Sequence, residues 1–433
     1  MRHCLRAALF LPLMALGASA AEPPAHQSRL SLNSPFDWIS EQQSKLDDAG
    51  LSLFFDYWGV FLANPVGGAA QGAAYNHLII FGGELDLEKT LGWKGGAIGI
   101  SAADVAGSNL SNRVGNIFIL SQAYVMNSFA LYDLYLKQKL LDDKLELRAG
   151  RLAAGQFFAA LPAFGLQVNS AVNGNPTPLF LNAPFTASPN ANWALYANYT
   201  EPAYYAQAGV FQASPRMTQT AYHGLDFSIR RDNGFLSMAE IGWTPAFGAT
   251  GARTSGDGKK AAAMPANPGL PGTYQFGGYY SYYTFENFHG GAQHNAYGFY
   301  LQGQQMIWRS AANENISFSL WGGATYSPQY QFALMPLMGY CGTVWQGVIP
   351  GRDQDQFLFS AYFGGFSSDY ADTVAAGVGG ARPTVETVLE WSYVIQLNKN
   401  LQFQPDLQYV IQPNGQRSIP NAFVLGFQIS ASF

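Results

Sequence analysis

The last thirteen residues, Asn421–Phe433 (NAFVLGFQISASF), alternate between two kinds of side chain. After Asn421 every odd-numbered position is apolar, and the even-numbered positions are mostly small or polar. Because successive side chains of a β-strand point to opposite faces, this pattern predicts a strand with one apolar face and one thin, wettable face.

The two preceding segments repeat the alternation. Leu401–Ile411 and Val385–Gln396 each set Leu, Ile and aromatic residues against Gln, Glu, Asp and Ser, and Asn398–Asn400 supplies a tight turn between them. A soluble sandwich also alternates, but its strands are usually shorter. Segments of about ten residues that end in aromatics and close on a terminal Phe are typical of transmembrane β-barrels. Within this pattern Pro405 cannot donate to the ladder, so we expect a bulge there.

The composition fits a barrel that meets lipid. Charged residues make up 12% of the 433 residues and aromatic residues 15%, as expected of an apolar outer band with aromatic girdles. The formal net charge of −5 gives no reason to propose a nucleic-acid partner. Cys341 is the one cysteine after the first few residues, which excludes an internal disulfide in the mature chain.

The N-terminus predicts export. Arg2 and Arg6 precede an apolar run, and Ala18-Ser19-Ala20 has the small residues of a cleavage site, so we expect a signal peptide over residues 1–20, cut after Ala20 or Ala21. Residues 21–50 then form a lead-in with a short periplasmic amphipathic helix at Pro35–Asp48, and residues 51–433 form the barrel domain. No later run has the roughly 18 apolar residues of a membrane helix, so a membrane-embedded chain would have to cross with strands.

Short and long connections take turns after Gly50, as expected of periplasmic turns and external loops. The expected short connections are Lys89–Trp93, Leu141–Lys144, Thr200–Ala203, Arg231–Gly234, Ala311–Asn315, Pro350–Asp355 and Leu397–Asn400. The expected long loops are Gly59–Asn76, Asp104–Gln122, Leu152–Asn190, Pro245–Asn295, Ser327–Gly339 and Ser367–Thr384, and the loops Ala213–Tyr222 and Gln412–Pro420 are of intermediate length. With a strand at Tyr340–Ile349, this predicts an all-β, antiparallel barrel of about sixteen strands with both termini in the periplasm. Within the longest loop, Tyr279–Tyr283 could form a small hairpin of its own.

Several stretches resemble the carbohydrate-selective porin (OprB) family of Gram-negative outer membranes. They are Leu85–Lys89 with Gly92–Gly95, Leu141–Lys144 running into Leu147–Leu152, Gly347–Arg352, and Gln404–Tyr409. The resemblance implies a sixteen-stranded outer-membrane pore that passes glucose and other small neutral sugars into the periplasm by passive diffusion. One departure is the run Ala153–Phe158, where the family often carries acidic residues, so the lining near the constriction is expected to differ.

The alternation of side chains along each strand identifies candidate pore-lining residues. Charges near the bilayer midplane would cost about 2–4 kcal/mol each if they faced lipid, so the charged face of each strand is expected to face the lumen. The candidates are Glu84, Asp86, Asp133, Lys137, Glu146, Arg148, Asp226, Arg230, Glu240, Glu386, Glu390, Gln404 and Asp406. Strict alternation points Arg151, a further candidate, outward unless the chain bends at Gly150. A structural network of ion pairs would produce the same charge pattern without binding a solute.

The third long loop, Leu152–Asn190, is the expected constriction, as third loops are in the porins that this chain resembles. It is almost uncharged but offers the rings of Phe157 and Phe158 and several amides, which suit a neutral polyol. Ordinary loop packing would account for the same residues.

Three other functions remain open from the sequence. A barrel hydrolase would need a nucleophile and base, yet the five histidines after the signal peptide lie in no catalytic motif, and we expect neither a metal nor a cofactor. An adhesin or purely structural barrel would share the strand rhythm but would not conduct ions. A general or anion-selective porin should have an excess of lumenal Lys and Arg, which the mixed, acidic-leaning candidates lack. The expected partners are sugars, outer-membrane lipid, and the barrel-assembly machinery through Phe433, in a monomer or a homotrimer.

Overall fold

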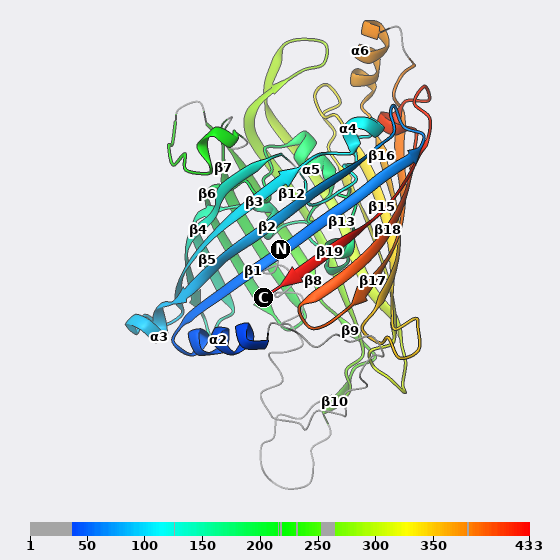
Figure 1. Ribbon diagram of the computed structural model, residues 1–433. Coiled ribbons are helices and arrows are strands. Elements are labelled where there is room, and N and C mark those ends of the chain that lie inside the picture. The colour runs from blue at the N-terminus through cyan, green and yellow to red at the C-terminus, as the bar shows by residue number, and fades with distance from the viewer. Residues whose placement is uncertain are drawn as a thin grey trace, which may run out of the picture.

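Sixteen long strands close into an antiparallel barrel in this computed structural model (Figure 1), which confirms the predicted fold class. The structure describes residues 37–124, 126–214, 216, 219–230, 233–252, 265–378 and 381–433, so the expected signal peptide and most of the lead-in lie outside the described residues. The barrel strands are β1 (Leu51–Val66), β2 (Gly72–Asp86), β3 (Gly96–Gly107), β4 (Ser128–Leu140), β5 (Leu145–Leu152), β6 (Asn192–Glu201), β7 (Tyr204–Ala213), β8 (Gly234–Trp243), β12 (Leu270–Glu286), β13 (Ala292–Arg309), β14 (Ser317–Tyr326), β15 (Leu337–Gln346), β16 (Gln356–Gly365), β17 (Val385–Gln396), β18 (Leu401–Ile411) and β19 (Ala422–Ser432).

The barrel closes where the last strand meets the first. β19 pairs with β1 from Asp56–Ser432 through Ala63–Leu425, and beyond it the backbone amide and carbonyl of Phe433 both bond to Phe55. Three short strands follow β8: β9 (Ala246–Phe247) pairs with the start of β12, and β10 (Thr250–Ala252) and β11 (Pro265–Asn267) form a separate two-stranded sheet.

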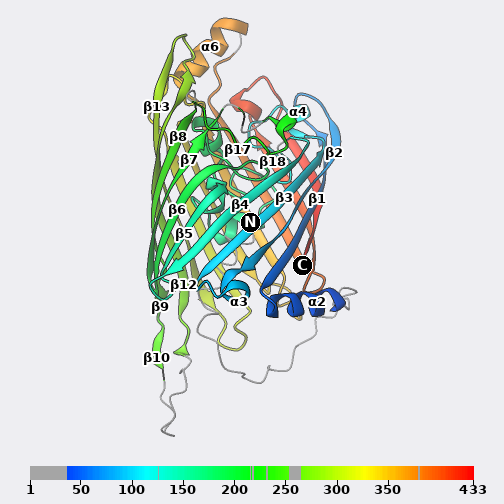
Figure 2. The same ribbon diagram turned by 90° about the vertical axis from the view of Figure 1, so that its left-hand side faces the viewer.

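Helices mark the two ends of the barrel (Figure 2). We call the end with α2 (Asp37–Asp48) and α3 (Leu87–Leu91) the turn end, and the opposite end, with α4 (Ser111–Val114) and α6 (Ser368–Val378), the loop end. The remaining helical segments are α5 (Thr177–Asn182) and the 3₁₀ turns η1 (Ala154–Gln156), η2 (Pro162–Leu166), η3 (Thr220–Tyr222) and η4 (Pro413–Gly415). From Asp37 onward α2 confirms the predicted helix. None of the helices that the structure describes is both long and apolar enough to span a membrane.

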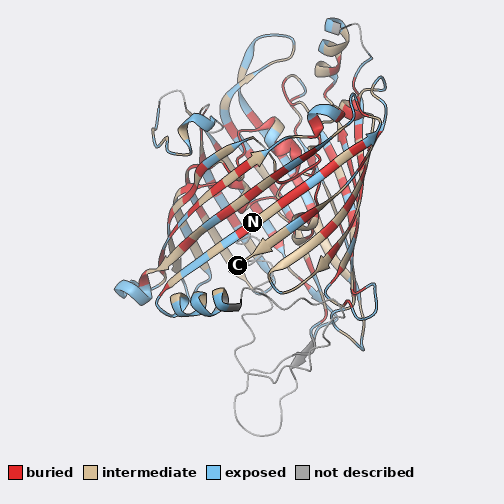
Figure 3. Ribbon diagram, viewed as in Figure 1, coloured by how far each residue is buried: buried red, intermediate tan, exposed pale blue. Residues whose placement is uncertain are grey.

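Burial follows the alternation that the sequence predicts (Figure 3). In β6, for example, Leu195 is 66% exposed on the outer face, whereas Ala194 and Tyr196 beside it are buried. The inward positions are therefore covered, and the outward positions form an apolar band suited to lipid.

Two predicted connections were wrong in ways that offset each other. The sequence suggested a strand just before Arg231 and a loop over Pro245–Asn295. Instead, the described part of residues 214–233 carries no strand, while Leu270–Glu286 forms β12, so the total stays at sixteen. The sequence of β12 resembles a loop because it is rich in Tyr and Gly and has Gly277 on its inward face. The tyrosine stretch belongs to this strand and forms no hairpin of its own.

The expected first loop, Gly59–Asn76, is mostly strand. β1 runs to Val66 and β2 starts at Gly72, leaving only a short turn in which Gly67 has φ 76°. Alternation is lost here because the inward residues Val60 and Leu62 are themselves apolar and fully buried inside the barrel. The expected bulge at Pro405 is also absent, since the register with β17 continues unshifted from Asp406 to Phe403.

Candidate pore constriction

Two segments fold inside the barrel and run along its inner wall. They are residues 117–122, in the connection between β3 and β4, and residues 156–169, in the connection between β5 and β6; we call them together the inner belt. Phe118, Phe158 and Val168 in these segments are completely buried. The predicted inward folding of Leu152–Asn190 is therefore confirmed, and a second segment accompanies it.

The inner belt is bonded to successive barrel strands by inward side chains. Four neighbouring strands contact residues 157–163 in turn, through Gln207 Nε2 to the Phe157 carbonyl (2.8 Å), the Ala159 amide to Glu240 (2.9 Å), Gln275 Nε2 to the Ala160 carbonyl (3.0 Å) and the Ala163 amide to Gln304 Oε1 (2.9 Å). The next two strands, β14 and β15, pack Trp321 and Tyr340 edge-on against the ring of Phe164.

Strands β16 to β19 continue the same track. Their contacts are Ser360 Oγ to Gln167 Oε1 (2.7 Å), the Val168 amide to Glu390 (2.7 Å), Gln404 Nε2 to the Leu166 carbonyl (2.8 Å), Gln408 Nε2 to the Leu120 carbonyl (2.9 Å) and Gln122 Nε2 to Gln428 Oε1 (3.0 Å). The inner belt thus covers the wall from β7 round to β19.

Three inward glutamates accept backbone N–H groups from the described inner segments. Glu386 accepts the amides of Ile117 and Phe118 at 2.9 Å each, and a third from Asn414. Glu240 and Glu390 do the same for residues 156–169, and all three carboxylates are at most 2% exposed. Parity predicted their inward direction correctly, but the inner belt covers them, so they do not face a solute.

The wall from β2 to β5 carries a charged cluster that the inner belt leaves partly exposed. Lys137 Nζ donates to Glu84, and Tyr135 Oη donates to the same carboxylate at 3.0 Å. Arg148 Nε donates to Glu146 at 2.7 Å. We call Glu84, Lys137, Glu146 and Arg148 the charged wall; between 9% and 23% of each side chain remains exposed. The alternation of side chains along the strands predicted correctly that these four residues point into the lumen.

An aromatic pair joins the charged wall to the inner belt. The ring of Phe157 stacks on Tyr196, with centroids 3.9 Å apart and planes 23° apart. The guanidinium of Arg148 lies 5.4 Å from the centroid of Phe157 and 4.9 Å from that of Tyr135. In contrast, Phe158 is fully buried against Tyr196 and Phe211. The prediction that Phe158 contacts a solute was therefore wrong, because this ring packs the inner belt onto the wall.

The other predicted lining residues have structural contacts. Asp133 is buried and accepts from Ser101 (2.9 Å) and Gln156 (2.7 Å). Asp86 lies at the turn end, where its carboxylate accepts the Glu88 and Lys89 amides and caps α3. Gln404 and Asp406 are buried behind the inner belt. None of the four lies on the exposed part of the lumenal wall.

Arg151 faces outward, as strict alternation implied, and is not pore-lining. It is paired in register with Trp193 on β6, and residues 219–230, which we call the outer strap, fold over both. Its guanidinium donates to the carbonyls of Ala191 (2.7 Å) and Asp226 (3.1 Å). Hydrogen bonds from Ser228 lower the pKa of Asp226. The predicted lumenal positions of Asp226 and Arg230 were therefore wrong.

Among the glutamines that hold the inner belt, only Gln404 was a candidate from the sequence. Alternating Gln residues in β18 are visible in the sequence, but nothing local distinguishes a side chain that meets water from one that meets a loop backbone.

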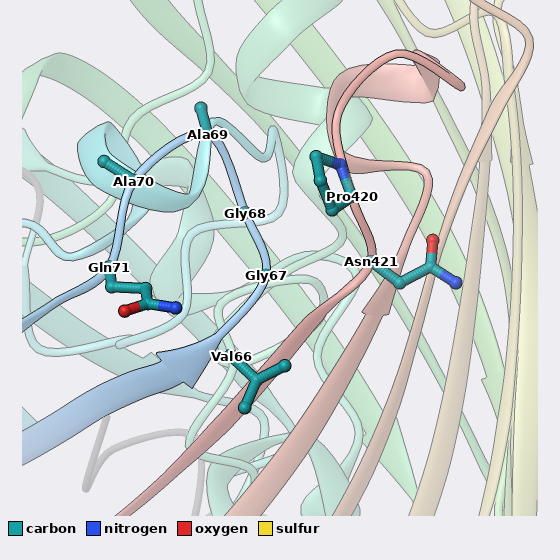
Figure 4. Close-up of a pocket in the computed structure, with 8 residues that line it drawn as sticks. All are labelled: Val66, Gly67, Gly68, Ala69, Ala70, Gln71, Pro420 and Asn421. Carbon is teal, nitrogen blue, oxygen red and sulfur yellow. The ribbon is translucent and has the colours of Figure 1, made fainter.

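A separate hollow of about 550 Å³ lies at the loop-end rim (Figure 4). It is lined by Val66–Gln71, Pro420 and Asn421, carries no charged side chain and lies apart from the charged wall.

Comparisons with known proteins agree with this architecture. Residues 70–433 match the model of the "Carbohydrate-selective porin, OprB family". Porin B of Pseudomonas aeruginosa is 26% identical over 463 aligned residues, which cover 97% of this chain and 96% of that protein.

Solved structures give the same fold. The high-pH structure of Pseudomonas putida OprB has a TM-score of 0.79 at 23% identity, covering 92% of this chain and 97% of that one. Its low-pH structure has a TM-score of 0.58 at 20% identity, covering 94% and 99%. The family match extends over most of the barrel, so this chain belongs to the OprB family of carbohydrate-selective porins.

Proposed function

We propose that small neutral sugars cross this porin by passive diffusion between the charged wall and the face of Phe157. The observation that supports this path is that the charged wall remains partly exposed where the inner belt covers its neighbours. Membership of a porin family makes the chain an outer-membrane channel rather than an enzyme.

The charges of this wall suit a neutral, hydroxyl-rich solute. Lys137 is paired with Glu84 and Arg148 with Glu146, so the cluster presents two cations and two anions and no net charge. Sugar hydroxyls both donate and accept, so they can bond to carboxylates and to ammonium or guanidinium groups alike. The stacked rings of Phe157 and Tyr196 add an apolar surface for the face of a sugar ring.

The orientation and assembly of the channel follow as further parts of the proposal. The loop end faces the exterior and the turn end the periplasm, as the lengths of the connections suggest for barrels of this kind. The chain is exported through a cleaved signal peptide, and Phe433 presents it to the barrel-assembly machinery. The outer band would serve either a monomer or a homotrimer.

Single-channel conductance in planar bilayers tests the proposal. Glucose should reduce the conductance saturably, a larger disaccharide should do so less, and Phe157→Ala should weaken the glucose block. Phe235→Ala, which removes an exposed ring on the outer face of β8, is the matched control and should leave the block unchanged. A conductance that glucose leaves untouched would indicate the alternative, a general porin, and an absence of conductance would exclude a pore altogether.

A further inference from the structure

We infer that Glu240 and Glu390 are positioning residues that set the width of the pore by holding the inner belt at two places on the wall. This inference concerns the size of the opening and does not depend on which solute passes.

The two carboxylates bind opposite ends of one segment. Glu240, on β8, accepts the amide of Ala159 at 2.9 Å. Glu390, on β17, accepts the amides of Val168 (2.7 Å) and Asn169 (3.0 Å). The residues between them follow the wall across the strands that separate β8 from β17, so these bonds fix where the inner segment begins and ends its path.

Each carboxylate is itself oriented by neutral donors. Glu240 accepts from Tyr205 (2.6 Å), Tyr300 (2.7 Å) and Gln207 (2.7 Å). Glu390 accepts from Tyr362 at 2.6 Å. A buried carboxylate is costly unless its oxygens are bonded, and a buried backbone amide is costly unless it finds an acceptor. The two requirements are met together only while the inner belt stays against the wall.

The side-chain type matches the polarity of the backbone that it meets. Where the inner belt presents carbonyls, at Phe157, Ala160 and Leu166, the wall supplies glutamine amide donors. Where it presents the amides of Ala159, Val168 and Asn169, the wall supplies glutamate, which can only accept when ionised. Gln304 is the exception, accepting from Ala163 through its amide oxygen. This matching argues for positioning rather than for binding of a solute.

The test removes both carboxylates. In Glu240→Gln the NH₂ group would face N–H or O–H donors at either oxygen position, and in Glu390→Leu the amides of Val168 and Asn169 lose their acceptor; every charge-assisted bond lost should raise the detached fraction of the inner belt by roughly tenfold. We expect larger single-channel conductance and passage of larger polyethylene glycols in a size-exclusion series, readouts that need no sugar. Glu201→Gln, at the turn end, is the control for loss of a carboxylate.

A covalent tether distinguishes the effect of displacing the inner belt on conductance from the effect of losing the two charges. Ala163→Cys with Gln304→Cys, built on the double variant in a Cys341→Ser background, should restore the small conductance when a short reducible thiol cross-linker joins the two positions, and release it when the cross-linker is reduced. If the double variant does not fold, the two single variants carry the same measurement. Folded variants whose conductance and exclusion limit equal those of the wild type would overturn the inference.

Discussion

At the scale of single residues, the same residue type has different roles at different places in the barrel. The glutamates show this most clearly: Glu84 pairs with Lys137 on the partly exposed charged wall, whereas Glu390 accepts backbone amides behind the inner belt. Both alternate correctly in their strands, so parity assigns them the same face. Their roles differ because one side of the lumen is covered and the other is not.

The glycine at the β1–β2 turn should be intolerant of substitution. A Cβ on Gly67 would lie 1.7 Å from the carbonyl oxygen of Asn421, in the connection to the closing strand β19, and its φ is 76°. Gly248 has a similar φ of 74° with open space around it, so Gly248→Ala is the matched control. The control should lose about 1–2 kcal/mol from its left-handed backbone alone, and Gly67→Ala should lose clearly more. Urea unfolding in detergent measures both; equal losses would show that the backbone relaxes around the added methyl group.

At the scale of elements, the outer strap compensates for the shortness of β5 and β6. β4 extends beyond the loop end of β5, where Leu131 donates its amide to the His223 carbonyl of the outer strap instead of to a strand. The segment keeps a strand-like alternation, with Leu225, Phe227 and Ile229 exposed, and this explains why its sequence predicts a strand.

Arg151 should stabilise the outer strap without affecting conduction. Arg151→Ala leaves the carbonyls of Ala191 and Asp226 without this donor, a loss of about 1–3 kcal/mol. Limited proteolysis should cut residues 219–230 faster in the variant, and single-channel conductance should be unchanged. A changed conductance would return Arg151 to the pore-lining residues.

At the scale of the whole molecule, we expect ion selectivity to depend on the balance of positive and negative charges in the charged wall. Arg148→Ala leaves Glu146 unpaired and the wall with a net negative charge, whereas Glu146→Gln leaves it net positive. A unit charge at about 6 Å in a water-like medium contributes about 0.7 kcal/mol, favourable for one ion and unfavourable for the ion of opposite sign, so the cation-to-anion permeability ratio should shift roughly tenfold, upward in the first variant and downward in the second. Reversal potentials in a salt gradient measure the shift. Movement of both variants in one direction would contradict the pairing of Arg148 with Glu146.

Much of the architecture follows from local pattern. Alternation in Val385–Phe433 specifies long strands with one apolar face, whereas the predicted count of sixteen strands was right only because two wrong connections offset each other. The same alternation turns Glu84, Lys137, Glu146 and Arg148 inward. Register places Lys137 beside Arg148 on the neighbouring strand, whereas Lys137 reaches Glu84 across β3, which has only Ala97 and Gly99 at the matching positions. The sequence could not show β12 as clearly, since its inward glycine and many tyrosines resemble a loop.

The pattern of residues along the chain therefore predicts the barrel and the face on which each strand residue lies, because both depend on a period of two. Which inward residues are covered by the inner belt and which stay partly exposed depends on the three-dimensional fold. That choice depends on residues 117–122 and 156–169 meeting strands far away in sequence, as when Val168 bonds to Glu390. A buried backbone amide needs a hydrogen-bond acceptor. Here the strands of the closed barrel supply that acceptor, not the neighbouring residues along the chain.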